Sequence, residues 1–480
     1  MAVAQIDEVL DLIGFGWIQV LMFLGCTFAS IFIVNEIIGI NVVSVDIACE
    51  FSLSSLELSI LSSAGFAGLI LGSHYSGFKT DQIGRRKVMM YSLCMAVSSS
   101  MTSIFMPTFY LFALLRFLTG LFVSGASCNN ITYMSEYTKA KYRASIINFM
   151  CYAFAASAIY LPLVAYMLAP MNRVMFTMYK FKWQTWRLSL LINMTPGILA
   201  IIFFATLPES AKFLLSIGED ERAYQTINRL YKSKRKQDLT SVGITGVTDP
   251  DTPSNLGDNR NCCVKIWRGT APLFRQPLVG NFLICTTILC GFLFVGSAIS
   301  MWFMELRQLM GNRRMTICDM LQSNATNTVK AQRICPSKTS NYIDSVVLGS
   351  TFLGCSIAVS VFLLCMRHFQ ILFMFTTLAT ICGLSLNMLV DNVPILVATA
   401  LFTTLCTSCI PLISSVLLDL MPTHIRGMAI SMAFLFARLS VIVANILMGF
   451  CMVPYCLLTF NLFVLITLVV AILSCTLPKS

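Results

Sequence analysis

Long apolar runs dominate this chain and constrain its fold more than any other feature. A helix that spans a bilayer needs about 20 mainly apolar residues. Runs of that length predict spanning helices at 16–38, 56–77, 87–106, 108–134, 144–168 and 186–207, and again at 278–304, 342–365, 369–390, 393–418, 428–450 and 453–477. Because 57% of the residues are hydrophobic and 11% are charged, the chain cannot cover itself with polar surface as a soluble domain does. The bilayer must therefore be part of its solvent.

One long polar segment divides these helices into two sets of six. We expect a cytoplasmic segment at 1–15, a first bundle at 16–207, a cytoplasmic central loop at 208–276, and a second bundle at 277–477 with an outer loop at 306–341. Within the central loop, the pattern predicts an amphipathic helix at 219–236 and a flexible linker at 241–261. The predicted fold class is an all-α membrane protein with twelve transmembrane helices in two pseudo-symmetric six-helix bundles.

The distribution of basic residues predicts the orientation of the chain. The net charge of +11 resides in loops between apolar runs, so we expect contact with the lipid bilayer and no nucleic-acid partner. Cytoplasmic loops carry an excess of Lys and Arg, which places the central loop and, with an even number of helices, both termini in the cytoplasm. The outer loop at 306–341 is also basic and is an exception to this rule.

The most specific motif follows the second predicted helix. It resembles the signature loop of the major facilitator superfamily and reads Gly77-Phe78-Lys79-Thr80-Asp81-Gln82-Ile83-Gly84-Arg85-Arg86-Lys87. Its glycines permit a tight turn at the membrane surface. Asp81 can pair with a basic group or a helix N-terminus and so hold one conformation of the two halves. The equivalent segment of the second half, 365–369, lacks this pattern.

An acidic–basic spacing recurs in both halves. Glu136 precedes Arg143 by seven residues after the fourth helix, and Asp419 precedes Arg426 by seven after the tenth. Transporters built from two related halves show internal repeats of this kind. We expect Glu136, Arg143, Asp419 and Arg426 to form gating salt bridges at the cytoplasmic helix ends. The signature-loop residues Gly77, Asp81, Gly84, Arg85 and Arg86 are further candidates for a gating or conformational role.

Further motifs resemble transporters related to synaptic vesicle glycoprotein 2, and sugar and organic-ion carriers share several of them. They lie at 7–19, 116–120, 135–137, 186–187, 207–214, 302–303 and 419–427, so the resemblance covers essentially the whole chain. Three departures stand out. Ile33 takes a place where the family often has a second acidic residue, Ala211-Lys212 replaces a Pro-Arg pair, and the outer loop is far shorter than a large luminal domain.

Three ionisable residues fall inside predicted membrane helices. A charge at that depth costs about 2.5–3.5 kcal/mol on insertion scales, so Glu36, Arg116 and Arg438 are candidates for substrate binding or ion coupling. Glu36 can carry a proton or bind a cation, Arg438 can hold an anionic group, and Arg116 can do the same or brace neighbouring helices. A structural charge network is the alternative for all three. Trp302 in the seventh helix is a fourth candidate contact.

The outer loop carries two candidate modification sites. Asn324-Ala325-Thr326 is an N-glycosylation acceptor, and Cys318 and Cys335 are candidates for a disulfide. Most of the 19 cysteines lie in apolar runs, where cysteine behaves as a small hydrophobe. The sequence has no Gly-x-x-x-x-Gly-Lys loop and no histidine cluster, so we expect no ATP-driven pump, no cofactor and no metal site.

The resemblance implies a transporter and not an enzyme. We expect a monomer, in the plasma membrane or an intracellular vesicle membrane, that carries a small organic solute by secondary active or facilitative transport, with H+ or Na+ as the coupling ion. Two cationic candidates against one carboxylate favour an organic anion or zwitterion. Two alternatives stay open: a facilitative sugar carrier, and a non-transporting membrane glycoprotein that regulates or recruits vesicle proteins.

Overall fold

Helices make up most of the computed structural model, which describes residues 2–171, 174–178, 181–248, 271–276, 278–309, 316–319, 339–421, 426–452 and 454–477. The spans of the first half are α2 (Trp17–Val42), α4 (Ser55–Ile83), α5 (Arg85–Ile104), α6 (Phe109–Glu136), α7 (Ala140–Leu168) and the pair α8 (Thr185–Asn193) and α9 (Thr195–Thr206). Those of the second half are α13 (Leu278–Leu309), α15 (Thr339–Phe362), α16 (His368–Ser385), the pair α17 (Asn392–Ser408) and α18 (Ile410–Leu420), α19 (Arg426–Cys451) and α20 (Cys456–Cys475). The predicted arrangement of two six-helix sets is confirmed.

Two spans are interrupted by proline. Pro196 stands at the start of α9 and Pro411 at the start of α18. Proline lacks the backbone N–H that would bond to the preceding turn, so each span consists of two shorter helices in sequence.

Ten described spans are long and apolar enough to cross a membrane. The other two are α7, which counts only over Tyr152–Leu168, and α5. The helix α5 is rich in serine, yet its hydroxyls find partners. Ser98 Oγ donates to the Cys94 carbonyl at 2.8 Å, and Ser92 Oγ donates to the Phe122 carbonyl of α6. A serine bonded to a helix carbonyl no longer needs water, so α5 can remain within the bundle.

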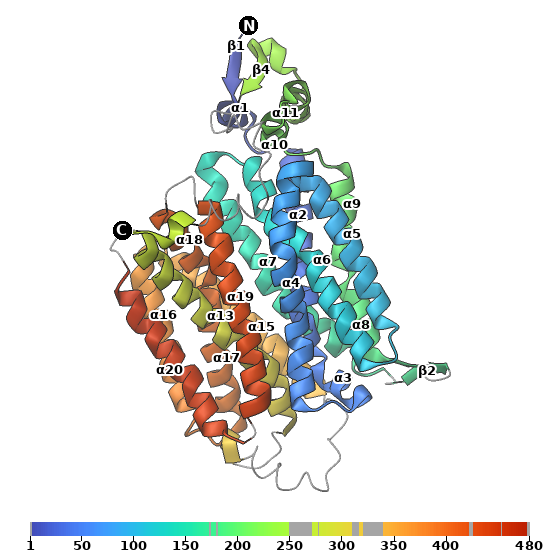
Figure 1. Ribbon diagram of the computed structural model, residues 1–480, viewed down its shortest axis with the longest axis vertical. Coiled ribbons are helices and arrows are strands. Elements are labelled where there is room, and N and C mark those ends of the chain that lie inside the picture. Colours follow the sequence, from blue (N-terminus) through green and yellow to red (C-terminus); the bar gives the residue numbers. More distant parts are fainter. Residues whose placement is uncertain are drawn as a thin grey trace.

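The two halves lie side by side, with the helices coloured blue to green on one side and those coloured yellow to red on the other (Figure 1). The N-terminus, α10 (Ala211–Ser216) and α11 (Asp220–Arg235) lie beyond one end of the helices, and the C-terminus is nearer to that end (Figure 1). We call this end the terminal face and the opposite end, where α3 (Ser44–Phe51) lies, the distal face.

Small residues bring α4 and α6 into close contact. A side chain at Gly68 or Gly72 of α4 would collide with the backbone of α6, and one at Gly120 of α6 would collide with the backbone of α4 at Gly65. Glycine therefore lets these two backbones approach each other as in other membrane helix pairs.

The start of the chain folds onto the central loop and forms what we call the N-terminal module. Strand β1 (Ala2–Gln5) pairs in parallel with β4 (Ile244–Thr248), and α1 (Ile6–Ile13) follows directly. The helix α1 buries one face, consisting of Ile6, Val9, Leu10 and Ile13, in the same hydrophobic cluster as residues of α11, η1 (Leu239–Val242) and β4. Lys212 Nζ lies 3.1 Å from Asp7 Oδ1 and adds an ion pair to this contact.

The module corrects the predicted linker at 241–261. The amphipathic helix predicted at 219–236 is confirmed as α11, but residues 244–248 form a strand. Its partner is β1, at residues 2–5, which is so distant in sequence that no local pattern could indicate the pairing. The remaining residues, from 249 on, lie outside the described residues.

A second pair of strands lies at the distal face. There β2 (Val174–Met178) pairs antiparallel with β3 (Phe181–Gln184), just before α8.

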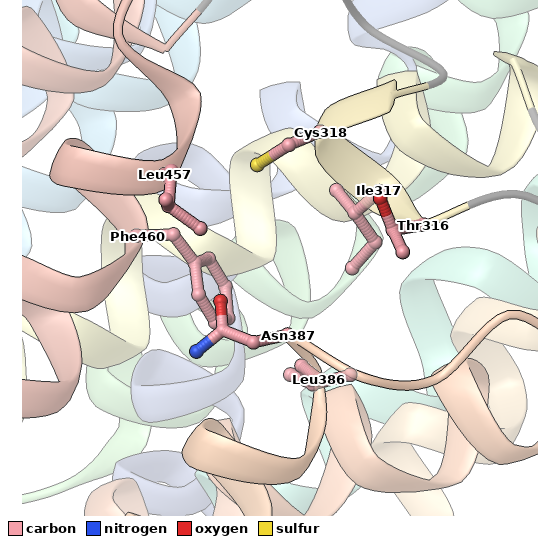
Figure 2. Close-up of a pocket in the computed structure, with 7 residues that line it drawn as sticks. All are labelled: Thr316, Ile317, Cys318, Leu386, Asn387, Leu457 and Phe460. Atoms are coloured by element: carbon pink, nitrogen blue, oxygen red, sulfur yellow. The ribbon is translucent and has the colours of Figure 1, made fainter.

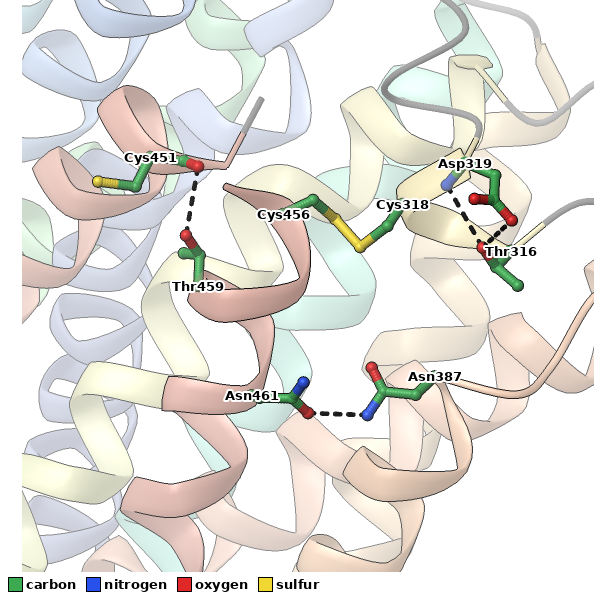
Figure 3. The surroundings of a disulfide bond; sticks show 8 residues. All are labelled: Thr316, Cys318, Asp319, Asn387, Cys451, Cys456, Thr459 and Asn461. Carbon is green, nitrogen blue, oxygen red and sulfur yellow. Dashed lines mark hydrogen bonds between the residues drawn. A yellow bond between two sulfur atoms is a disulfide. The ribbon is translucent and has the colours of Figure 1, made fainter. Parts of the chain in front are cut away.

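The segment 316–319 is attached to the distal end of the second half. It borders a cavity of about 30 Å³ whose lining includes Ile317, Leu386, Asn387 and Phe460 (Figure 2). Its Cys318 is bonded to Cys456 at the start of α20 (Figure 3), with the Cα atoms 5.5 Å apart.

The predicted disulfide between Cys318 and Cys335 is therefore wrong. Cys456 is 138 residues away in sequence and becomes the partner because α20 begins beside the segment. Cys335 and the predicted glycosylation site Asn324 lie outside the described residues.

The N-terminal module yields a first prediction. Val9→Asp places a carboxylate at a side chain that is 0% exposed, and burying an unpaired charge costs at least about 2 kcal/mol. We expect α1 to detach, and limited proteolysis to cleave the chain between α10 and β4 faster than in the wild type. Leu12→Asp is the matched control, because Leu12 lies on the same helix and is 46% exposed. Equal cleavage rates for both variants would contradict the packing described.

Candidate functional site

The signature loop and the segment after α9 form one network at the terminal face. The Glu209 carboxylate accepts hydrogen bonds from the backbone N–H of Arg86 at 2.8 Å and of Lys87 at 3.3 Å. These are N–H groups of the first turn of α5, which have no partner inside the helix. A carboxylate at a helix N-terminus is also favoured by the helix dipole. Glu209 therefore caps α5.

The arginines of the loop bind neighbouring helices. Arg85 Nε lies 3.2 Å from Glu136 Oε1 at the end of α6, and Ser210 Oγ donates to the other oxygen of Glu136. Arg86 Nε donates to the Phe204 carbonyl of α9 at 2.7 Å. Together these contacts join α5, α6 and α9, all of which belong to the first half.

The structure corrects two details of this network. The helix α4 continues to Ile83, so Gly77 lies inside a helix and only Gly84, with φ of +106°, makes a turn. A side chain at Gly84 would also collide with the Glu209 carboxylate. The motif at 207–214 was the only signal for Glu209 in the sequence, which gave no reason to place it beside α5.

The other predicted gating residues are not all placed. Asp419 is exposed near the end of α18 and forms no ion pair with a described side chain. The side chains of Asp81, Arg143 and Arg426 lie outside the described part of the structure. The gating salt bridges predicted for Arg143, Asp419 and Arg426 therefore stay predictions, whereas a contact between Glu136 and Arg85 is observed.

Glu36 and Arg116, both selected from the sequence, form a buried ion pair. Arg116 Nη1 on α6 lies 2.7 Å from Glu36 Oε2 on α2, and each side chain is 3% exposed. Ser100 Oγ on α5 donates to the same carboxylate oxygen at 2.7 Å. The guanidinium also lies over the Phe112 ring, 5.4 Å from its centroid. The pair thus joins three helices of the first half.

Arg438 occupies a different place, between the two halves. From α19 it donates to Ser73 Oγ of α4 at 2.9 Å and to Ser127 Oγ of α6 at 3.2 Å. The Phe434 ring lies 6.0 Å from the guanidinium carbon. No carboxylate among the described side chains forms an ion pair with Arg438. It is therefore a cation at mid-membrane depth that faces hydroxyl groups.

The candidates do not converge on a single pocket. Arg116 and Ser127 are eleven residues apart on α6, which corresponds to about 16 Å along the helix axis. Arg438, which binds Ser127, is thus well separated from the ion pair. The Glu36–Arg116 pair and Arg438 are two sites.

Trp302 belongs to neither site. It is 2% exposed in the hydrophobic core of the second half, and its Nε1 has no hydrogen-bond partner among the described residues. Ser440, two residues after Arg438 on α19, donates through Oγ to the Cys290 carbonyl of α13. Cys290 therefore lies at about the same depth in the bundle as Arg438. Twelve residues, or about 18 Å, separate Cys290 from Trp302. Trp302 therefore lies toward the distal face.

Contacts between the halves continue from Arg438 to the distal face. Gly449 of α19 packs so closely on Ser59 of α4 that any side chain there would collide. Beyond it, Tyr342 OH on α15 donates to Asp46 on α3. A further contact between the halves lies nearer the terminal face, where Tyr152 OH of α7 and Ser360 Oγ near the end of α15 are 2.6 Å apart. We call the contact of α4 with α19 the seam, and its distal end is closed.

The family can now be identified. The sequence profile of the sugar (and other) transporter family matches residues 25–296, which is more than half of the chain. The chain belongs to that family. Its members are major facilitator superfamily transporters and not enzymes, as the signature loop implied.

Relatives of this chain are found in worm and mammals. The svop-1 protein of Caenorhabditis elegans is 29% identical over 232 residues, which are 48% of this chain and 42% of that protein. SVOPL of Homo sapiens is 27% identical over 48% of this chain and 44% of that protein. Synaptic vesicle glycoprotein 2B of Rattus norvegicus is 21% identical over 57% of this chain and 40% of that protein. The alignments thus span less than half the length of each relative.

Solved structures share the fold over nearly the whole chain. XylE, the xylose transporter of E. coli, in a partially occluded inward-open conformation superposes with a TM-score of 0.68 at 13% identity and covers 96% of this chain and 100% of that chain. A D-xylose–proton symporter superposes with a TM-score of 0.65 at 14% identity and covers 96% of this chain and 98% of that one.

The buried ion pair yields a second prediction. Removing one partner of such a pair costs about 3–5 kcal/mol, because the other charge stays buried. We expect Glu36→Leu and Arg116→Leu each to lower the thermal unfolding temperature of the detergent-purified protein strongly. The double variant should lose much less than the sum of the two. Additive losses would show that the two charges do not stabilise each other.

Proposed function

We propose that this protein is a secondary transporter that carries a small organic solute with an anionic group by alternating access. The observation that supports the proposal most strongly is Arg438. It lies between the two halves, near the middle of α19 (Arg426–Cys451), and its described hydrogen-bond partners are neutral: two serine hydroxyls and the Cys128 side chain. Substrate sites of transporters built from two halves lie near the bilayer midplane at the interface of the halves.

A guanidinium at this depth is costly unless it binds something. An ionised residue inside the membrane is a functional site by default, and a guanidinium prefers a carboxylate or phosphate, which it can bind through two parallel hydrogen bonds. Ser73 and Ser127 satisfy only part of its five N–H donors. An anionic solute would supply the missing charge.

The Glu36–Arg116 pair supports H+ as the coupling ion. Protonation of Glu36 would remove the charge that Arg116 binds and so free a guanidinium within the first half. The described ligands of Glu36 are one arginine and one serine, whereas a metal cation such as Na+ would need several oxygen ligands. One of the structural neighbours is named a proton symporter, which agrees with this choice of ion.

A sugar is the second candidate substrate. The family is named for sugar transporters, and the structural neighbours carry xylose. Ser73 and Ser127 beside Arg438 could bond to sugar hydroxyls. In that case Arg438 would act as a hydrogen-bond donor, and the charge of the solute would not matter.

The disulfides support a cytoplasmic location for the terminal face. Cys318–Cys456 lies at the distal face, and Cys49 at the end of α3 is also disulfide-bonded. Disulfides persist in extracellular or luminal compartments. The distal face would therefore face outward or toward a vesicle lumen, and both termini would be cytoplasmic.

Binding of three related probes tests the substrate class. We expect hexanoate and gluconate, which are anions, to raise the thermal unfolding temperature of the purified protein, because a ligand of the folded state stabilises it. Glucose should have no effect. Arg438→Gln should abolish both anion effects, whereas Arg367→Gln, which changes an exposed arginine, should preserve them. A shift with glucose alone would favour the sugar candidate, and no shift with any probe would favour a non-transporting role.

The coupling ion has its own test. In proteoliposomes, Glu36→Gln should abolish accumulation of gluconate driven by a pH gradient, because the variant cannot take up or release a proton at this position. Exchange of labelled for unlabelled gluconate needs no net proton movement and should continue. Accumulation that survives in Glu36→Gln would exclude Glu36 as the coupling residue.

A further inference from the structure

One stripe of α19 faces the first half along the distal part of the seam. It consists of Arg438, Val441, Asn445 and Gly449, whose spacing of three and four residues places them on one side of a helix. Arg438 binds Ser73, Val441 packs in the hydrophobic core of the first half, and Gly449 rests on Ser59. Asn445 lies between these contacts and therefore faces the seam as well.

Asn445 is buried there without any hydrogen bond. Its side chain is 0% exposed, and neither Nδ2 nor Oδ1 has a partner among the described residues. No other buried asparagine in the described part of the chain has both amide atoms unpaired. Asn35, for example, bonds to the Asn193 carbonyl at 2.9 Å and accepts from Ser157.

A second buried polar group, on the α4 side of the seam, also has no hydrogen-bond partner among the described residues. Ser63 on α4 is 5% exposed, and its Oγ has no partner among the described residues. It lies one helical turn from Ser59, which Gly449 contacts. The helices run in opposite directions, because Ser59 meets Gly449 whereas Ser73 meets Arg438. One helical turn from the Ser59–Gly449 contact, in the direction of Arg438, α4 carries Ser63 and α19 carries Asn445, and both side chains are unpaired among the described residues.

Unpaired polar groups at this place make the closed seam less stable. Each buried donor or acceptor without a partner costs about 1–3 kcal/mol, and hydrocarbon offers it no alternative partner. Two apolar residues would pack the seam at no such cost. If the distal end of the seam opens, solute or water can supply the partners that these groups lack among the described residues.

We propose that Asn445 and Ser63 form a second subsite on the distal side of Arg438, which binds a neutral hydroxyl of the same solute whose anionic group Arg438 holds. The inference rests on the proposed function, and it narrows the substrate class to hydroxylated organic anions. An amide that can donate and accept matches a hydroxyl, which does both. About 10 Å along α19 separates Asn445 from Arg438, and the length of the arginine side chain reduces the distance that a solute must bridge.

Two probes of similar chain length test the subsite. Gluconate carries a carboxylate and hydroxyls, whereas hexanoate carries the carboxylate alone. We expect Asn445→Leu to raise the gluconate concentration for half-maximal stabilisation about tenfold and to leave that for hexanoate unchanged. Ser63→Ala should act in the same direction with a smaller effect. Asn461→Leu is the control, because it removes an amide of the second half that is bonded to Asn387 instead.

The ratio of the two affinities separates a binding role from a purely conformational one. A variant that only shifts the balance between open and closed seams changes the apparent affinity for both probes by the same factor. An unchanged gluconate-to-hexanoate ratio in Asn445→Leu would therefore overturn the subsite. A wild-type protein that binds neither probe would reject the proposed anionic substrate itself, and the subsite with it. Asn445→Leu should fold, because it replaces an unpaired amide by an apolar group of similar size.

Discussion

A polar atom inside a bilayer has no water to bond to, and this constraint governs most of the contacts that hold each half together. The serines of α5 bond to helix carbonyls, and Asn35 bonds across to α7 and α8. Arg187, which is fully buried near the distal face, bonds to Glu50 at 2.7 Å. Glu36 and Arg116 bond to each other, although Nε and Nη2 of Arg116 have no partner among the described residues. Each half thus contains many paired polar groups that bind its helices to one another.

The seam between the halves does not meet this requirement. The described partners of Arg438 are neutral side chains, and Asn445 and Ser63 have no partner among the described residues. These groups lie where alternating access must separate one surface from another. A fully bonded seam would be harder to open, whereas unpaired groups lower the free-energy difference between the closed and the open state. Unpaired polar atoms also occur inside the halves, for example Arg116 Nη2 and Trp302 Nε1, but those of Asn445 and Ser63 lie where the two halves must separate.

The terminal face shows how the first half is held as one body. Glu209 caps α5, and Arg85 and Arg86 bind the ends of α6 and α9. The N-terminal module packs on the same half, since its residues belong to one hydrophobic cluster with residues of α2 and α6. A fold of this kind tolerates large divergence, because XylE superposes over 96% of the chain at 13% identity. What persists at such identity is the pattern of apolar spans rather than the residues of a particular site.

The spans, the division into two halves and the family resemblance can all be predicted from the sequence. Each span depends on about 20 neighbouring residues whose hydropathy is a local property, and the signature motif is equally local. Glu36, Arg116 and Arg438 can be identified as candidates for the same reason, because a charge within an apolar run is visible in the sequence.

The folded structure adds that the first two form a pair and that Arg438 lies elsewhere. It also decided that Cys318 bonds to Cys456 rather than Cys335, and that β4 pairs with the start of the chain. Contacts such as these join residues that are distant in sequence, and they depend on how whole helices pack, which no local pattern records.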